Sequence, residues 1–570
     1  MRKLLKYLKG YEKESIIGPL FKMLEASFEL IVPLIMANII DVGIKNQDKA
    51  YILRCGGILV LLGVLGLSCS LTAQYFAAKA ALGFGTALRR DMFHHINTLS
   101  YSEIDDIGTS SLITRMTSDI NQAQSGVNLV LRLFLRSPFI VIGAFIMSFM
   151  ISPKITIIFA VAIPVLSYII SKIVLVTRPL YKNVQKKLDV VSKGTRENLA
   201  GVRVIRAFSR QETEKKEFDE NSNVLYELQK HVGKIAALLN PMTYVVVNLA
   251  IIAIIWAGGL QVDSGSITQG DVTALVSYMT QILLALIALS NLIVTFTKAT
   301  ASASRINDVF AISSSLTDEG ATKQTSLEDA KKIEFKNVSF SYHNAKETSL
   351  QEINLQVSAG ETIGIIGGTG SGKSTLINMI PRFYDATQGS VEIDGIPVGK
   401  YPLEQLRAKV GMVPQKAVLF KGTIRENMKW GKPDATDEEI YEALEIAQAR
   451  EFVDTKPEGL DTMLTQGGKN LSGGQRQRLT IARALVGKPE ILILDDSASA
   501  LDYATDAKLR KALQERTKGM TVFIVSQRAA SMKHANQILV LEDGEAVGLG
   551  NHESLMQTCE IYQEICLSQR

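Results

Sequence analysis

The chain has 570 residues, of which 46% are hydrophobic and 21% charged, and its formal net charge is +5. This length predicts two or three domains, and the small positive charge without a basic, aromatic-interleaved block argues against nucleic acid binding. The four cysteines lack metal-ligand spacing and are predicted to be free thiols: Cys55, Cys69, Cys559 and Cys566.

The first residues, MRKLLKYLKGYEKES, are basic but are not followed by an apolar core with a cleavage site. They are therefore not expected to form a cleaved signal peptide. Leu4, Leu5 and Leu8 recur at helical spacing among lysines, which predicts a short helix on the inner membrane surface.

Six segments of the first half are predicted to cross a membrane, since a hydrocarbon core needs about 20 apolar residues per helix. They are 16–40, 55–78, 137–153, 155–171, 235–262 and 272–297, and the third and fourth form a hairpin that turns at ISPKIT. The connections 79–129 and 172–234 are helical in pattern and too long for plain loops. We therefore expect them to continue the membrane helices into the cytoplasm.

Lysine and arginine are frequent near the N-terminus and in 172–234, whereas the opposite connections contain few. The positive-inside rule then predicts an inner (plasma) membrane protein with both termini in the cytoplasm. Glu29 lies about midway along the first span, where two interpretations remain open. It either lines a cavity that attracts cationic cargo or pairs with a neighbouring base.

The pattern changes in the second half, where short β-rich runs alternate with helical segments, as in KIEFKNVSFSY, GETIGIIG, SVEIDG, ILILD and TVFIVS. Such alternation predicts a mainly parallel α/β sheet. The fold class is therefore an α-helical six-span transmembrane domain followed by an α/β domain, and the run GGTGSGKST in the second domain makes it a P-loop nucleotide-binding domain. The predicted boundaries are 1–315 for the membrane domain, 316–331 for a linker and 332–570 for the second domain.

The run GGTGSGKST directly follows an apolar strand and satisfies the spacing G-x-x-x-x-G-K-[ST]. Glycines let the backbone N–H groups point at phosphate oxygens, and the N-terminus of the following helix adds positive potential. Lys373 is predicted to neutralise the β- and γ-phosphates, and Ser374 to bind Mg²⁺. Asp495 ends the later strand ILILD, where a second Mg²⁺ ligand is expected.

The segment LSGGQRQRL lies about a hundred residues after this loop. Ser472 and the two glycines open a helix and present further N–H donors, although Ser472 alone is also a common helix cap.

In this order, GGTGSGKST, LSGGQ and ILILDD…SALD resemble the ATP-binding cassette transporters, and six spans before one cassette are similar to a half-transporter of the exporter type. The resemblance implies ATP and Mg²⁺ as ligands and a second half-transporter as partner. In that family two cassettes face each other head to tail, so each ATP lies between the phosphate loop of one chain and the signature of the other.

The resemblance also implies roles for individual residues. Tyr342 would stack on adenine, and Gln415 would contact Mg²⁺ and sense the γ-phosphate, although either is also an ordinary strand-edge or loop residue. Asp502 would lie at the dimer seam or simply end a turn. The phosphate loop comprises Gly367, Gly368, Thr369, Gly370, Ser371, Gly372, Lys373, Ser374 and Thr375, and the signature comprises Ser472, Gly473, Gly474 and Gln475. Coupling helices would lie at about 108–115 and 201–208, with Phe208 as a docking aromatic residue.

Three positions depart from the pattern of efficient hydrolases in the family. Asp496 stands where a catalytic glutamate is usual, Gln527 where a histidine is usual, and Gln466 where many exporters carry glutamate before the signature. Aspartate is one methylene shorter, glutamine cannot become cationic, and loss of a positioned base costs about 10²–10⁴ in rate. The chain thus resembles the degenerate-site subunit of a heterodimeric bacterial multidrug exporter.

The favoured function is ATP-driven export of amphipathic or drug-like molecules by a heterodimer, with hydrolysis mainly at the site shared with the partner's phosphate loop. A homodimeric exporter with two slow sites and an ATP-binding regulatory membrane protein are the alternatives. The sequence leaves the cargo open.

Overall fold

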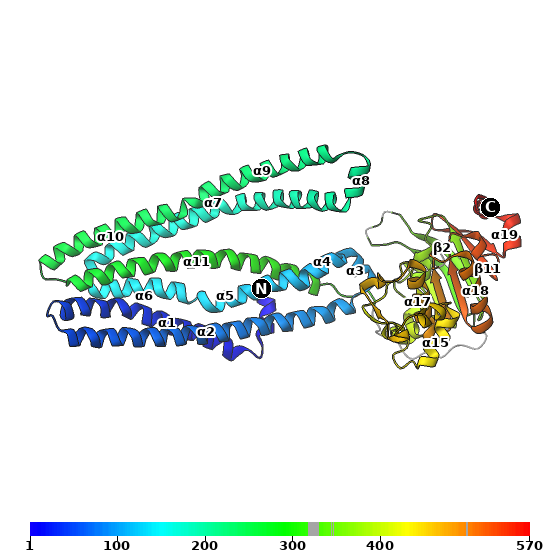
Figure 1. Ribbon diagram of the computed structural model, residues 1–570, viewed down its shortest axis with the longest axis horizontal. Helices are drawn as coiled ribbons and strands as arrows, with labels where there is room; N and C mark the ends of the chain where they lie inside the picture. The colour runs from blue at the N-terminus through cyan, green and yellow to red at the C-terminus, as the bar shows by residue number, and fades with distance from the viewer. Residues whose placement is uncertain (317–329, 344, 346, 498–499, 570) are drawn as a thin grey trace. The chain divides into compact units, whose positions relative to one another are not determined.

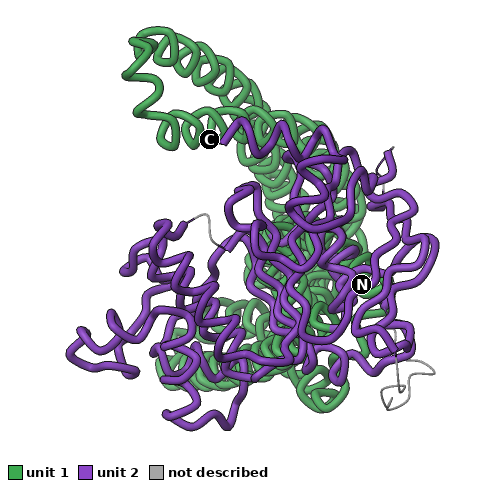
Figure 2. The backbone as a smooth tube through the Cα atoms, turned by 90° about the vertical axis from the view of Figure 1, so that its right-hand side faces the viewer, with its two compact units in different colours: residues 1–97, 110–312 green, residues 98–109, 313–570 purple. Residues whose placement is uncertain are grey.

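The computed structural model describes residues 1–316, 330–343, 345, 347–497 and 500–569, which form two compact units (Figures 1 and 2). Unit 1 comprises 1–97 and 110–312, and unit 2 comprises 98–109 and 313–570. The segment 98–109 thus belongs to unit 2, although it lies between two helices of unit 1 in the chain. The predicted linker 316–331 lies almost entirely outside the described residues.

Unit 1 is a bundle of long helices (Figure 1), and the described residues contain the six membrane-spanning helices that the sequence predicts. The spans run Glu12–Ile44, Lys49–Thr98, Thr109–Ile151, Pro153–Ala200, Gln211–Asp263 and Gln269–Phe310. Their main segments are α1 (Glu12–Asn38), α2 (Lys49–Thr98), α4 (Thr109–Thr114), α5 (Ile120–Leu133), α6 (Arg136–Ile151), α7 (Pro153–Ala200), α9 (Gln211–Ala237), α10 (Leu239–Asp263) and α11 (Gln269–Phe310).

Local capping explains where these helices begin. Ser152 separates α6 from α7 and caps α7 by accepting a hydrogen bond from the Ile155 N–H, and Pro153 occupies the first turn. The predicted hairpin at ISPKIT is therefore confirmed. Beyond the apolar stretches, α7 and α9 continue side by side and are connected by α8 (Val202–Ala207) (Figure 1). The expectation that the long connections are helical is also confirmed.

Charged residues inside the bundle are paired with one another. Lys22 lies 2.6 Å from Glu25. Arg136 donates from Nη2 to both carboxylate oxygens of Glu29 at 2.8 Å, and Gln281 donates to the Glu29 carbonyl at 3.2 Å. The structure therefore favours the pairing interpretation of Glu29, whose side chain is 42% exposed.

The N-terminal residues form a short helix, as predicted. Arg2–Leu8 form a 3₁₀ helix in which Leu4 and Tyr7 are buried, and the Tyr7 ring packs against Phe84 and Phe310. Leu5 is 48% exposed, and the position of this helix on the membrane surface stays a prediction.

Unit 2 contains two larger sheets and a small two-stranded one. The first sheet is antiparallel, with the order β2-β1-β4-β5, and the second has the order β12-β11-β3-β10-β9-β6, in which only the edge strand β12 is antiparallel. The strands are β1 (Ile333–Phe340), β2 (Leu350–Val357), β3 (Thr362–Gly367), β4 (Gln388–Ile393), β5 (Ile396–Pro397), β6 (Val410–Val413), β7 (Gly422–Thr423), β8 (Met463–Leu464), β9 (Ile491–Asp495), β10 (Thr521–Val525), β11 (Gln537–Glu542) and β12 (Glu545–Gly550).

The parallel sheet is buried on both faces, as its continuous apolar strands require. Ile491 and Ile493 of β9 pack into one core with β1 and β2, whereas Leu492 and Leu494 pack into another with the surrounding helices. The helices packed with Leu492 and Leu494 are α14 (Ile424–Met428), α15 (Asp437–Ile446), α16 (Arg450–Asp454), α17 (Gly473–Val486) and α18 (Tyr503–Arg516). The other core contains residues of α12 (Lys373–Asn378) and α13 (Leu403–Ala408), and α19 (His552–Thr558) and α20 (Glu560–Ser568) pack in a third. The predicted fold class is confirmed, and all four cysteines are buried free thiols, as predicted.

The short helix α3 (Tyr101–Ile107) belongs to unit 2. A capping box between Ser100 and Glu103 begins it, and Gly108 at φ 79° ends it. Asp105 accepts a hydrogen bond from the Tyr384 hydroxyl at 2.7 Å, and the Tyr101 ring lies 4.6 Å from that of Phe383. A coupling helix was predicted at about 108–115. The separate helix found here, α3, ends before that segment, and residues from Thr109 onward begin the third span.

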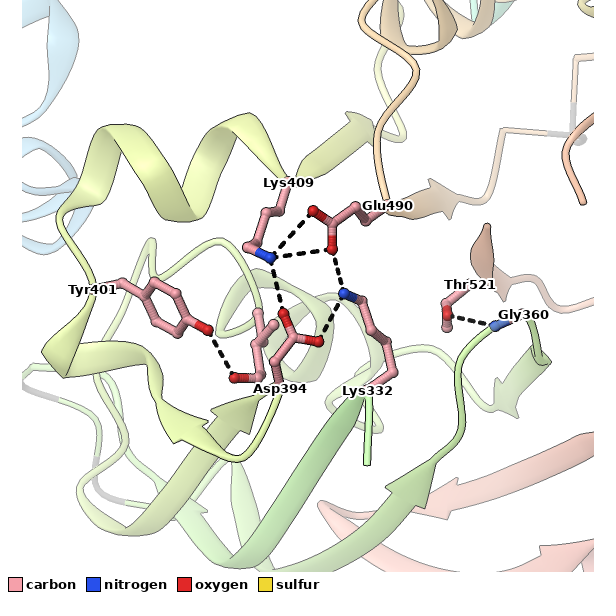
Figure 3. Close-up of polar contacts among 8 residues, drawn as sticks. Lys332, Gly360, Asp394, Tyr401, Lys409, Glu490 and Thr521 are labelled. Atoms are coloured by element: carbon pink, nitrogen blue, oxygen red, sulfur yellow. Dashed lines mark hydrogen bonds and ion pairs between the residues drawn. The ribbon is translucent and has the colours of Figure 1, made fainter. Parts of the chain in front are cut away.

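Four charged residues join the two larger sheets at the amino ends of β6 and β9 (Figure 3). Asp394, in the turn after β4, accepts from Lys332 and from Lys409 at 2.8 Å each. Glu490 accepts from Lys409 at 3.1 Å and also pairs with Lys332. Each residue lies at a strand end, so this cluster fixes how the two sheets are joined.

Both carboxyl groups of the cluster have lowered pKa values. Burial raises the pKa of Asp394 and of Glu490, but hydrogen bonds and charges from Lys332 and Lys409 outweigh it, so both pKa values lie below their usual values. Their stabilising contribution is therefore present above about pH 4, the unfolded pKa, and is lost as the pH falls through the folded values.

Lys332→Met should destabilise unit 2 at pH 7 by roughly 3 kcal/mol, because it leaves the buried Asp394 and the half-exposed Glu490 with one cation. Lys336→Met is the matched control four residues along the chain: its side chain is 47% exposed, against 10% for Lys332, and its loss should have a much smaller effect. Calorimetry of the full chain in detergent measures both, and the Lys332 effect should shrink at pH 2.5. Equal shifts at pH 7 would contradict the stabilising role.

Candidate nucleotide-binding site

The parallel sheet brings most of the predicted site residues to one edge. The carboxyl ends of adjacent parallel strands meet at the same edge of a sheet, where ligands of α/β folds bind. The phosphate loop follows β3, Gln415 follows β6, Asp495 ends β9 and Gln527 follows β10. Because β3, β10, β9 and β6 are neighbours in this order, residues from four separate parts of the sequence face one position.

The phosphate loop has a backbone that only glycine adopts easily at several points. Gly370 and Gly372 have φ of 87° and 92°, and a Cβ on Gly367 would lie 2.1 Å from the Leu541 carbonyl oxygen. Gly368 and Thr369 lie between these positions, and α12 starts at Lys373. The loop therefore leaves its N–H groups free to surround an anion at the start of a helix.

The Lys373 ammonium group folds over this loop. Its Nζ donates to the Gly367 carbonyl at 3.0 Å and to Ser371 Oγ at 3.3 Å, and it also bonds the Gly368 carbonyl. Burial lowers the pKa of Lys373, while the charges of Asp495 and Asp496 oppose this shift. Phosphate oxygens would compensate the ammonium group better than carbonyl oxygens, because they carry full charge.

The neighbouring oxygen ligands fit Mg²⁺, which prefers hydroxyl, carboxylate and amide oxygens. Ser374 donates its hydroxyl to Asp495 at 3.2 Å and 3.0 Å, and Gln415 is exposed beside them at the end of β6. Burial raises the pKa of Asp495, helped by the charge of Asp496 and opposed by the Ser374 hydrogen bond. A cation at this position would favour the ionised carboxylate.

Asp496 follows the last strand residue with φ 43°, a left-handed conformation that aspartate tolerates better than most residues. Its N–H donates to the Val525 carbonyl at 2.9 Å. Gln527 is exposed two residues further along that neighbouring chain segment. The two departures from the family pattern thus lie on adjacent strands at the same edge.

Tyr342 lies beside the first turn of α12. Its hydroxyl and Thr375 Oγ1 are 3.0 Å apart, and its ring makes edge contacts with Phe340 and Tyr384. About a third of its surface is exposed, which leaves one face of the ring for a planar ligand. Both interpretations of Tyr342, strand-edge residue and adenine contact, are compatible with this position.

The signature residues and Asp502 form a second group. Ser472 and Gln475 form the capping box of α17, with hydrogen bonds of 3.0 Å and 3.2 Å, and Asp502 caps α18 by accepting from the Thr505 N–H at 2.8 Å. A Cβ on Gly474 would lie 3.2 Å from the Ala500 carbonyl oxygen, whereas a Cβ on Gly473 would meet nothing within 4 Å. No hydrogen bond or ion pair among the described residues joins this group to the phosphate loop.

Sequence reasoning missed the contacts of α3 with Tyr384 and Phe383, although the capping box in SYSE was a signal for a helix start there. It also missed Gln569, which bonds the backbone on both sides of Arg528. No motif predicts the contacts of α3 or those of Gln569, because each joins residues that are far apart in the sequence. Phe208, the predicted docking residue, is 74% exposed at the end of α8.

Comparison with known proteins supports this geometry. The family model "ABC transporter transmembrane region" matches residues 15–286, and the model "ABC transporter" matches residues 350–499. The ABC transporter ATP-binding protein YfiB of Bacillus subtilis is 38% identical over 569 residues, covering 100% of this chain and 98% of the relative. The putative multidrug export ATP-binding/permease protein YgaD of the same organism is 33% identical over 578 residues, covering 99% and 98%.

Two further comparisons agree with the full-length match. The ATP-dependent lipid A-core flippase of Desulfotalea psychrophila is 36% identical over 476 residues, covering 83% of this chain and 82% of that relative. A solved bacterial Atm1-family ABC exporter with ATP bound superposes with a TM-score of 0.80 at 21% identity, covering 98% of both chains, which shows a shared fold.

The chain therefore belongs to the ABC transporter family. It is a half-transporter of the exporter type, in which a six-span membrane domain and an ATPase domain share one chain, and it is an ATP-driven exporter.

Replacing Asp495 by Asn should stabilise the nucleotide-free chain at pH 7, because the raised pKa means that folding disfavours the ionised carboxylate. We expect the midpoint of thermal unfolding to rise by a few degrees, about 2–4 °C per kcal/mol for a domain of this size. ATP with Mg²⁺ should then stabilise the variant less than the original chain. The exposed Asp434→Asn is the control, and a variant that is destabilised without ligand would contradict this description of Asp495.

Proposed function

We propose that this chain is one subunit of a heterodimeric exporter whose own phosphate loop binds ATP but cleaves it slowly. A different half-transporter would supply the glutamate and histidine that this chain lacks. The signature of this chain, 472–475, would complete the partner's competent site.

The observation that carries the proposal is the pair Asp496 and Gln527 at an otherwise intact sheet edge. Asp496 occupies the position from which a base would reach the attacking water. Its side chain is one methylene shorter than that of glutamate. Gln527 is exposed on the neighbouring segment and can donate a hydrogen bond, but it cannot carry a positive charge. Loss of a positioned base reduces rates by about 10²–10⁴.

The residue types that bind nucleotide in the family are retained, which supports the proposal that this site binds ATP. Loop N–H groups and Lys373 would bind the phosphates, Tyr342 would contact the base, and Ser374, Asp495 and Gln415 would hold Mg²⁺. The metal would neutralise charge on the β- and γ-phosphates. Gln466, at the start of a short 3₁₀ turn before the signature, is a further neutral residue in place of glutamate.

The intact signature indicates that some ATP is hydrolysed across it. Gly473 opens α17 with no neighbour over its Cα, and the capping box of Ser472 and Gln475 fixes the orientation of the helix start. This arrangement suits a surface that closes over a phosphate held by another chain. Asp502 would lie at the same seam, and α3 and α8 would be the coupling helices.

The cargo would be amphipathic, because the names of two relatives describe multidrug export and lipid A-core flipping. The Glu29–Arg136 pair offers both signs of charge inside the bundle, so it no longer argues for cationic cargo specifically. By the positive-inside rule both termini would lie in the cytoplasm of a cell whose inner (plasma) membrane holds the protein. The domain boundaries would be 1–315, 316–331 and 332–570.

Two alternatives give different observations. A homodimeric exporter with two slow sites would purify as copies of one chain, whereas a heterodimer contains a second half-transporter in equal amount. A regulatory membrane protein would use ATP binding as a switch without transport. The complete signature argues against the regulatory protein.

The heterodimer predicts that two substitutions in this chain differ in effect. Gly473→Asp should lower the ATPase rate of the complex by about 10²–10³, because the new side chain blocks approach to the partner's γ-phosphate and removes stabilisation of the transferring group. Lys373→Ala should lower it only about threefold to tenfold, since it weakens occupancy of a site that seldom cleaves ATP. Steady-state ATPase assays of the purified complex measure both.

Gly473 is preferred to Gly474 for this experiment because Gly474 is already crowded by Ala500 within its own chain. Asp is also favourable in a first helical turn, so a lost rate would not reflect an unfolded α17. The rate should be compared with that of Gly194→Asp, a glycine of α7 with open space over its Cα and no positive φ, after confirming equal expression. Equal losses from Gly473→Asp and Lys373→Ala would reject the asymmetric assignment.

A further inference from the structure

The residues after β10, 526–529, form the segment that contains Gln527, and we call it the switch segment. Ser526 donates its N–H to the Ile365 carbonyl of β3 at 3.2 Å and accepts a hydrogen bond from the Arg528 N–H on its Oγ at 3.0 Å. The start of the segment is thus fixed to the strand that leads into the phosphate loop. Gln527 itself is exposed, so its position depends on how the backbone on either side is held.

A residue more than 40 positions away holds this backbone. Gln569 donates its side-chain N–H to the Gln527 carbonyl at 2.7 Å, and its side-chain oxygen accepts from the Ala529 N–H at 2.8 Å. The side-chain amide of Gln569 therefore bonds the carbonyl of one residue and the N–H of the residue two positions later, which is the pattern that a neighbouring β-strand makes. Both bonds require the donor and the acceptor of glutamine.

The support for Gln569 is rigid. It follows α20, whose Tyr562 is fully buried and whose Cys566 is nearly so, in a core that also contains Met532 and Val540. The Tyr562 hydroxyl and His552 Nδ1 are 2.9 Å apart, which connects α20 to α19. Gln569 itself is exposed and directly follows the last residue of this packed helix.

The segment held in this way also contacts the residues beside Asp502. The Arg528 guanidinium lies over the Tyr503 ring, 5.2 Å from its centre, and Tyr503 is the first residue of α18. Asp502 is the N-cap of that helix. A continuous set of contacts therefore leads from Gln569 through the switch segment to Asp502.

We propose that Gln569 is a positioning residue, which fixes the switch segment at the ATP site of this chain and connects it to the start of α18. The proposal rests on the proposed function only in placing Gln527 beside the nucleotide phosphates. Without the amide, the Gln527 carbonyl and Ala529 N–H can bond water instead, so the fold survives while the segment gains freedom. Nucleotide held at this site would then be released faster.

The test compares Gln569→Ala and Gln569→Glu with Gln563→Ala, a control on the preceding helix α20, in the full-length protein within its native assembly. Gln569→Glu keeps the size and the acceptor, but it loses the donor and sets a carboxylate beside the Gln527 carbonyl. Hydrogen–deuterium exchange of the peptide containing 527–531 should be roughly tenfold faster in both Gln569 variants, as expected for loss of a net hydrogen bond. Gln563→Ala should match the original chain.

The functional readout is the dissociation rate of trinitrophenyl-ATP, a fluorescent analogue, measured with the partner's phosphate-loop lysine removed so that only the site of this chain reports. We expect dissociation about threefold to tenfold faster in both Gln569 variants. Unchanged exchange would overturn the contact, whatever the assembly. Faster exchange with unchanged dissociation would overturn the positioning role, and neither result depends on how ATPase rates divide between the two sites.

Discussion

Hydrogen bonding between parallel strands is the constraint on which the function of this chain depends. The pairing of β3 with β10, of β10 with β9 and of β9 with β6 places four carboxyl ends at one edge. A shift of one residue in the β9–β10 register would turn Asp495 into the opposite core, because successive side chains face opposite sides of the sheet. The loop glycines, the residues proposed to hold Mg²⁺ and the two unusual residues are therefore positioned by the backbone.

The same edge holds two adjacent aspartates in different surroundings. Asp495 and Asp496 are adjacent, yet burial and the Ser374 hydrogen bond set the surroundings of the first, and a left-handed backbone sets the direction of the second. A glutamate could extend past this bend, whereas an aspartate cannot reach as far. Under the proposed function, binding and cleavage rely on separate groups, so that a chain could lose one and keep the other.

Much of this arrangement could be predicted from the sequence, because its signals are local. Apolar length predicts the six spans, and the spacing of GGTGSGKST predicts a strand, loop and helix. The sequence did not predict contacts between distant segments: Arg136 with Glu29, Lys409 with Asp394, or Gln569 with the switch segment. Tyr7 shows the same limit, since its ring contacts Phe84 and Phe310, which are far away in the sequence.

Restoring the missing chemistry tests the central claim most directly. Asp496→Glu combined with Gln527→His should raise ATP turnover at the phosphate loop of this chain at least tenfold, since a positioned base contributes about 10²–10⁴. The measurement is made in the complex after the partner's catalytic glutamate has been replaced by glutamine, so that the remaining rate comes from this site. Turnover that stays at the silenced background would show that Asp496 and Gln527 do not limit hydrolysis here and would contradict the account.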